Sequence, residues 1–124
     1  MTQKKKILVI EDETSISKAL EFRFKKYGFE VVLAEDGEDG LNKAKEARPD
    51  IIILDLILPK MTGERVCKEI RKDDNISKIP IIMLTAKDSD VDRVVGRVIG
   101  ADRYMTKPFD LNALMREINK LLNL

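Results

Sequence analysis

Histidine is absent from this 124-residue chain, and cysteine occurs only once, as Cys67. Without histidine, the chain cannot contain a Ser-His-Asp triad, a His-ligated zinc site or a phosphohistidine of its own. One cysteine cannot form an internal disulfide, so a reducing cytoplasm is the expected compartment. Cys67 lies within a helical pattern and is expected to be a small packing residue.

Long apolar runs and a large excess of either charge are also missing. No apolar stretch approaches the ~20 residues that cross a bilayer, and residues 1–6 contain no signal-peptide core. The formal net charge is +1, so we predict neither a membrane segment nor direct binding of nucleic acid. The composition, 44% hydrophobic and 36% charged, fits a folded globular protein, and the length favours one domain over residues 1–124.

Strand-like and helix-like segments alternate along the whole chain. The expected strands are short apolar runs at 7–10, 31–33, 51–55, 81–84 and 103–105. The expected helices lie at 14–27, 37–48, 63–71, 89–99 and 111–122, with Asp36, Thr62 and Asp110 as caps for three of them. This regular alternation predicts an α/β fold in which a doubly wound parallel sheet is covered by helices on both faces.

Polar residues follow four of the expected strands directly. Glu11 and Asp12 come after the first strand, Asp55 ends the third, Thr85 follows the fourth and Lys107 follows the fifth. Because ligands bind at the carboxyl ends of parallel strands, these side chains are expected to share one site. Clustered carboxylates repel one another, and their oxygens suit Mg²⁺. An aspartate can also be the nucleophile in phosphoryl transfer, with an ammonium and a hydroxyl holding the phosphoryl oxygens.

Each of these residues also has a structural interpretation. Glu11 and Asp12 could cap the helix that follows, and Thr85 could be an ordinary strand-end residue. Lys107 could be a solvated loop residue, and Asp55 could be a buried acid that pairs with Lys107. The joint pattern favours the functional interpretation, because every member falls at the same end of its strand.

The chain resembles the receiver domains of two-component response regulators over essentially its whole length. The resemblance rests on the stretches at 7–12, 52–63, 79–86 and 100–109. It implies a flavodoxin-like receiver fold with five strands in the order 2-1-3-4-5. It also implies a signalling switch that is no enzyme beyond catalysing its own phosphorylation and dephosphorylation. Asp55 would accept the phosphoryl group from a histidine kinase or a phosphotransfer protein.

The resemblance further implies a Mg²⁺ site. Asp12, Asp55 and the backbone carbonyl of Ile57 would bind the ion, and Glu11 would reach it through water. Glu11 stands where an aspartate is common in the family, so we expect tuned rather than lost metal binding.

A switch mechanism is implied as well. Lys107 would bind the phosphoryl group, and the Lys107-Pro108 peptide would be cis. Thr85 would move toward the phosphoryl group, and Tyr104 would then swing inward from solvent. A downstream effector would read the change on one surface, which comprises the helix at 89–99, the strand at 103–105 and the helix at 111–122.

Two variable positions flank the predicted site and influence phosphoryl lifetime in the family. They are Ile57, two residues after Asp55, and Lys87, two residues after Thr85. Neither side chain is an acid or amide that could orient an attacking water, so we expect a long-lived phosphoryl group.

Several alternatives stay open at this point. A flavodoxin-type cofactor binder has the same topology, but Glu11 and its acidic neighbours would repel a phosphate. A haloacid-dehalogenase-type phosphatase typically has a second aspartate where this chain has Ile57. A pseudo-receiver that only docks to partners is the third alternative. The chain could also be a fragment of a larger regulator or form a homodimer.

Overall fold

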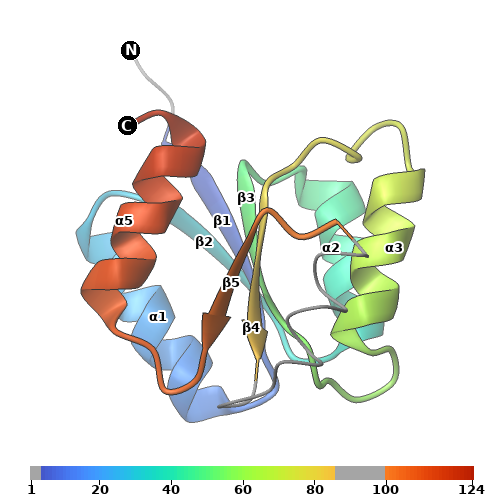
Figure 1. Ribbon diagram of the computed structural model, residues 1–124, viewed down its shortest axis with the longest axis horizontal. Coiled ribbons are helices and arrows are strands. Elements are labelled where there is room, and N and C mark those ends of the chain that lie inside the picture. Colours follow the sequence, from blue (N-terminus) through green and yellow to red (C-terminus); the bar gives the residue numbers. More distant parts are fainter. Residues whose placement is uncertain (1–3, 86–99) are drawn as a thin grey trace.

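The computed structural model describes residues 4–85 and 100–124 (Figure 1). Lys87 and the helix expected at 89–99 lie outside the described residues. The strands are β1 (Lys6–Ile10), β2 (Glu30–Ala34), β3 (Ile51–Asp55), β4 (Ile81–Thr85) and β5 (Arg103–Thr106). The described helices are α1 (Thr14–Lys26), α2 (Gly37–Ala47), α3 (Gly63–Lys72) and α5 (Leu111–Leu122). Among these described helices, none combines the length and apolarity needed to cross a membrane.

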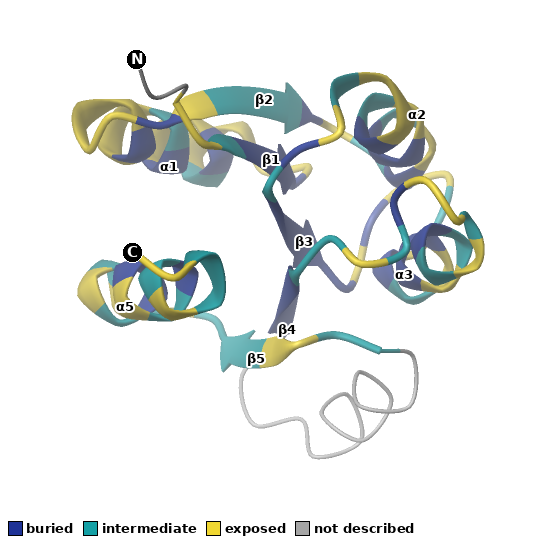
Figure 2. Ribbon diagram, turned by 90° about the horizontal axis from the view of Figure 1, so that it is seen from above, coloured by how far each residue is buried: buried dark blue, intermediate teal, exposed yellow. Residues whose placement is uncertain are grey.

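The five strands form one parallel sheet in the order β2-β1-β3-β4-β5. Helices α1 and α5 cover one face of this sheet, and α2 and α3 cover the other (Figures 1 and 2). The predicted doubly wound α/β fold and its strand order are therefore confirmed. From β1 the chain goes to β2 at one edge of the sheet, and it then returns to β3 on the other side of β1. The direction in which successive strands are added therefore reverses between β1 and β3.

Strand β3 is buried along its whole length, as its continuous apolar run predicts. Side chains alternate between the two faces, so Ile51 and Ile53 pack with α1 and α5, whereas Ile52 and Leu54 pack with α2 and α3. Figure 2 shows the same burial through β1 and β4, while the edge strands β2 and β5 are more exposed. Cys67 on α3 is fully buried in the core between the sheet and helices α2 and α3, as predicted.

The three predicted helix caps are confirmed. Asp36 accepts a hydrogen bond from the Asp39 amide at 2.7 Å, and Thr62 accepts one from the Arg65 amide at 3.2 Å. Asp110 caps α5 in the same way (Asn112 amide, 2.9 Å). These bonds satisfy amides that would otherwise lack partners in the first turn, and they fix where α2 and α3 begin beside the sheet edge.

Candidate functional site

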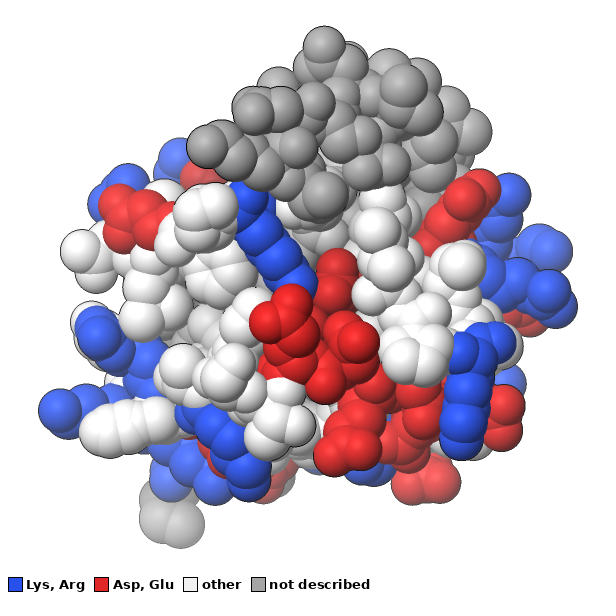
Figure 3. All heavy atoms as spheres, turned by 90° about the horizontal axis from the view of Figure 1, so that it is seen from below, with Lys and Arg blue, Asp and Glu red and all other residues white. Residues whose placement is uncertain are grey.

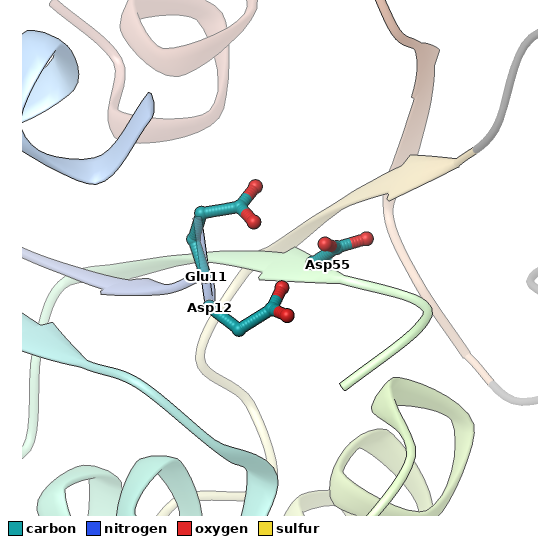
Figure 4. Close-up of side chains that lie close together, drawn as sticks. All are labelled: Glu11, Asp12 and Asp55. Carbon is teal, nitrogen blue, oxygen red and sulfur yellow. The ribbon is translucent and has the colours of Figure 1, made fainter. Parts of the chain in front are cut away.

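The sheet register brings the predicted site residues to one edge. Ile10 pairs with Leu54, so Glu11 and Asp12 leave β1 beside the end of β3, where Asp55 lies. Thr85 pairs with Thr106, which places Lys107 directly after the end of β5 at the same edge. Figure 4 shows the carboxylates of Glu11, Asp12 and Asp55 pointing into a common space. One oxygen from each of the three carboxylates lies within 4.8 Å of the others.

Lys107 is the cation of this site. Its ammonium nitrogen lies 2.7 Å from Glu11 Oε1 and 3.0 Å from Asp55 Oδ2. Burial alone would lower the pKa of Lys107, but the Glu11 and Asp55 carboxylates outweigh it, so this pKa lies above its usual value. Lys107 is therefore charged at neutral pH, and the solvated-loop interpretation of this residue is wrong.

Glu11 is the most buried of the three acids. It is 1% exposed, Asp55 is 7% exposed, and Asp12 is exposed. While Glu11 Oε1 faces Lys107, Glu11 Oε2 accepts a hydrogen bond from the Glu13 amide at 3.1 Å, just before α1. Glu11 does not cap α1, because the N-cap residue is Glu13 and no side-chain capping bond is made there. Its side chain instead supports the turn before α1 and belongs to the acidic cluster.

The charge balance of the cluster suits a divalent cation. Three carboxylates gather around a single ammonium, which leaves an excess of negative charge among these four groups. Figure 3 shows acidic side chains gathered on this side of the molecule. Hard oxygen ligands at this density are the kind that Mg²⁺ binds. Within residues 4–85 and 100–124, the Asp12 carboxylate makes no hydrogen bond or ion pair. It is therefore the most available of the three carboxylates for binding a metal ion.

The loop after β3 completes the rim of the site. The Ile57 amide donates to Asp55 Oδ1 at 3.3 Å, and the Ile57 side chain is 68% exposed. Ile57 is therefore largely in solvent, while its backbone amide is held close to Asp55.

Thr85 and Tyr104 lie on the neighbouring strands. Thr85 is fully buried at the end of β4, and its carbonyl accepts a hydrogen bond from the Lys107 amide at 2.8 Å. Tyr104 on β5 packs against the core beneath α2 and α3, and its hydroxyl oxygen is buried. The structure therefore already has Tyr104 turned inward, whereas the resemblance implied a starting position in solvent. The Lys107-Pro108 peptide is cis, as the resemblance implied.

Two glycines matter to the site and were missed by the sequence reasoning. Gly63 begins α3, and its amide bonds to the Leu56 carbonyl at 2.8 Å. A Cβ on Gly63 would lie 2.7 Å from Leu56 Cα and would also collide with the Asp55 carbonyl. Gly37 begins α2 in an equally tight position against Met61. The available signal was a glycine directly after the predicted caps Asp36 and Thr62, where a poor helix former stands at the start of a helix.

Comparisons with known proteins agree with this geometry. The model of a family described as response regulator receiver domain matches residues 7–119. The alkaline phosphatase synthesis transcriptional regulatory protein PhoP of Bacillus subtilis (strain 168) is 47% identical over 117 residues, which are 92% of this chain and 48% of that protein. The chain thus spans about half the length of this curated relative.

Solved structures are similar over nearly the whole chain. The chemotaxis protein CheY4 of Vibrio cholerae superposes with a TM-score of 0.90 at 33% identity, over 97% of this chain and 100% of that one. The receiver domain of the sensor histidine kinase PA1611 from Pseudomonas aeruginosa PAO1 has a TM-score of 0.90 at 30% identity, over 98% and 100% of the two chains. That structure has a magnesium ion coordinated in its active site cleft.

Proposed function

Since this chain belongs to the response regulator receiver domain family of two-component systems, we propose that Asp55 accepts a phosphoryl group from a histidine kinase or a phosphotransfer protein. The observation that carries this proposal is the convergence of Glu11, Asp12 and Asp55 within 4.8 Å, with Lys107 at 3.0 Å from Asp55. The family assignment replaces the flavodoxin-type and dehalogenase-type interpretations.

The acidic cluster would hold Mg²⁺ through Asp12, Asp55 and the Ile57 carbonyl, with Glu11 reaching it through water. Support comes from the excess of negative charge around Lys107. Mg²⁺ bound there would neutralise charge on an arriving phosphoryl group. Glu11 already contacts Lys107 through one carboxylate oxygen and the Glu13 amide through the other. Both oxygens thus have direct partners in the protein, which fits a contact with the ion through water.

In the transfer itself, an Asp55 oxygen forms a new bond to phosphorus while the P–N bond to the donor imidazole breaks. The imidazole leaves with the electron pair of that bond. Lys107, which is charged and adjacent to Asp55, would donate a hydrogen bond to a phosphoryl oxygen. Thr85 would offer its hydroxyl to another. The chain thus supplies the nucleophile and the donors, and it catalyses only its own phosphorylation and dephosphorylation.

The signal would leave the domain through β5, α5 and the helix expected at 89–99, to a downstream effector or in a homodimer. Phosphorylation adds charge and acceptor oxygens beside Thr85, and Tyr104 on β5 would respond to its movement. A cytoplasmic setting is part of this proposal. If the chain is a fragment of a longer regulator like the Bacillus relative, which is named a transcriptional regulatory protein, the output would be transcription.

The test is phosphorylation in vitro. The wild-type protein is incubated with acetyl phosphate and Mg²⁺, and its intact mass is measured. We expect the gain of one phosphoryl group, which does not occur when EDTA is present from the start and is absent in Asp55→Asn. Asp50→Asn is the matched control, because Asp50 lies just before β3, at the opposite end of the same strand, and should not affect labelling. No phosphoryl gain in the wild type would contradict the proposal and favour a docking module that works without phosphorylation.

A further inference from the structure

The start of α2 packs directly against the loop that follows β3. The Gly37 amide donates a hydrogen bond to the Pro59 carbonyl at 3.2 Å. A Cβ on Gly37 would collide with the Met61 carbonyl oxygen and would lie 2.7 Å from Met61 C and 2.8 Å from Met61 Cβ. Real Cβ atoms essentially never approach other atoms closer than 3.0 Å. Any residue with a side chain at position 37 would therefore push the two backbones apart.

The loop at 56–62 has backbone hydrogen bonds at its base and near its tip. The Gly63 amide bonds to the Leu56 carbonyl at 2.8 Å and closes the loop at its base. Near the tip, the Met61 amide bonds to the Pro59 carbonyl at 2.7 Å, and Lys60 has a left-handed backbone with φ +67°. Because the loop is short and carries these two internal bonds, we expect a displacement at Met61 to reach the backbone of Ile57.

We propose that Gly37 is a positioning residue for the metal site and acts through the loop at 56–62. This inference rests on the proposed function, in which the Ile57 carbonyl binds Mg²⁺ beside Asp12 and Asp55. Gly37 touches none of these ligands. By lacking a side chain, it lets α2 support the loop in the place where the Ile57 carbonyl and the Asp55 carboxylate would hold the ion. Ligand geometry needs to be held within about 0.5 Å, so a small displacement of the loop is enough to weaken binding.

The test compares Gly37→Ala with Gly40→Ala. Both substitutions fall on α2, but a Cβ on Gly40 would meet side-chain atoms of Ile10, at 2.6 Å to 2.9 Å. Magnesium chloride is titrated into each ¹⁵N-labelled protein, and the amide signals of Asp55 and Ile57 are followed. We expect Gly37→Ala to bind Mg²⁺ about 10-fold more weakly or worse, because a displacement of about 1 Å can cost up to 100-fold at a functional site. Gly40→Ala should lose stability and keep its Mg²⁺ affinity. Equal Mg²⁺ affinity in Gly37→Ala and wild type would overturn the inference.

A measurement on the wild type decides the matter if Gly37→Ala does not fold. Coupling between two sites is reciprocal, so bound Mg²⁺ should stabilise the Gly37–Pro59 contact. We expect saturating Mg²⁺ to slow hydrogen exchange of the Gly37 amide several-fold. The Arg48 amide, which bonds to the Ala44 carbonyl at the other end of α2, serves as the control and should not change. Unchanged exchange at Gly37 would overturn the inference, whereas a wild type that binds no Mg²⁺ would refute the proposed function itself.

Discussion

The ammonium nitrogen of Lys107 lies 3.0 Å from Asp55 Oδ2, so the proposed phosphoacceptor is already paired with the residue proposed to hold its phosphoryl group. Glu11 lies on the other side of the same ammonium, at 2.7 Å. Both carboxylates are buried, and each depends on Lys107 to offset its charge. This shared dependence makes Lys107 as important for stability as for chemistry, and the two roles can be measured separately.

Lys107→Met should lower the free energy of unfolding at pH 7 by about 2 kcal/mol, because charge-assisted hydrogen bonds to two buried carboxylates are lost. Added Mg²⁺ should restore part of this loss by supplying positive charge to the same carboxylates. Urea unfolding with and without Mg²⁺ checks both statements. The control is Lys68→Met, which removes an exposed pair with Glu64 at 3.4 Å and should change stability by less than about 0.5 kcal/mol. A Lys107 variant as stable as this control would contradict the prediction.

Stability at high pH should depend on Lys107. Its pKa is raised in the folded state above the usual 10.5, so its contribution is fully present below the unfolded-state pKa. This contribution is lost as the pH rises through the folded-state value. We expect the stability difference between wild type and Lys107→Met to be constant from pH 7 to 9 and to shrink above pH 10.5. Denaturation at a series of pH values measures it, and a difference that does not change with pH would show that the ammonium charge is not responsible.

Asp12→Asn should make the metal-free protein more stable. The substitution removes one of three carboxylates whose oxygens lie within 4.8 Å of one another, and it breaks no hydrogen bond or ion pair among the described residues. We expect the free energy of unfolding to rise by about 0.5–1 kcal/mol, a gain typical of relieving a strained functional site. Mg²⁺ affinity should fall at the same time, as calorimetry can measure. A variant that is less stable and binds Mg²⁺ normally would contradict this role for Asp12.

Ile57→Asn should shorten the life of the phosphoryl group. Ile57 is 68% exposed, and its backbone amide donates to Asp55 Oδ1 at 3.3 Å, a bond that the substitution retains. An amide at this position could orient an attacking water, which isoleucine cannot. We expect loss of the phosphoryl group to become several-fold faster, measured by intact mass against time. Ile57→Val is the control, and equal lifetimes in all three proteins would show that the side chain does not shield the site.

Cys67 should be unreactive in the folded protein. Burial in the core raises the pKa of its thiol to about 11, so almost no thiolate is present at pH 8, and no reagent can reach it. We expect a disulfide reagent such as 5,5′-dithiobis(2-nitrobenzoate) to label the protein only when urea unfolds it. Rapid labelling of the native protein at pH 8 would mean that α3 opens locally.

The features that sequence reasoning predicted best are those that follow from a single physical rule. Continuous apolar runs such as 51–54 had to be buried on both faces, and parallel strands had to deliver Asp55 and Lys107 to one edge. Strand order came from the family resemblance, because the alternation of strands and helices does not determine it. The sequence could not reveal that Glu11 divides its two oxygens between Lys107 and the Glu13 amide, since that depends on side-chain conformation. The glycine after the Asp36 cap could be seen in the sequence, but its close contact with Met61 could not, because only the assembled sheet brings these two segments together.

Asp55 and Lys107 are 52 residues apart in the chain and meet only because β5 pairs beside β4. During synthesis, Glu11, which follows β1, and Asp55, at the end of β3, therefore leave the ribosome well before the lysine that offsets their charge. A nascent chain that has completed β3 but not β5 lacks the Lys107 ammonium beside Asp55, so we expect it to react poorly with a phosphodonor. We expect signalling competence to arise only when the last strand docks, which would keep unfinished polypeptides from drawing phosphate away from mature molecules.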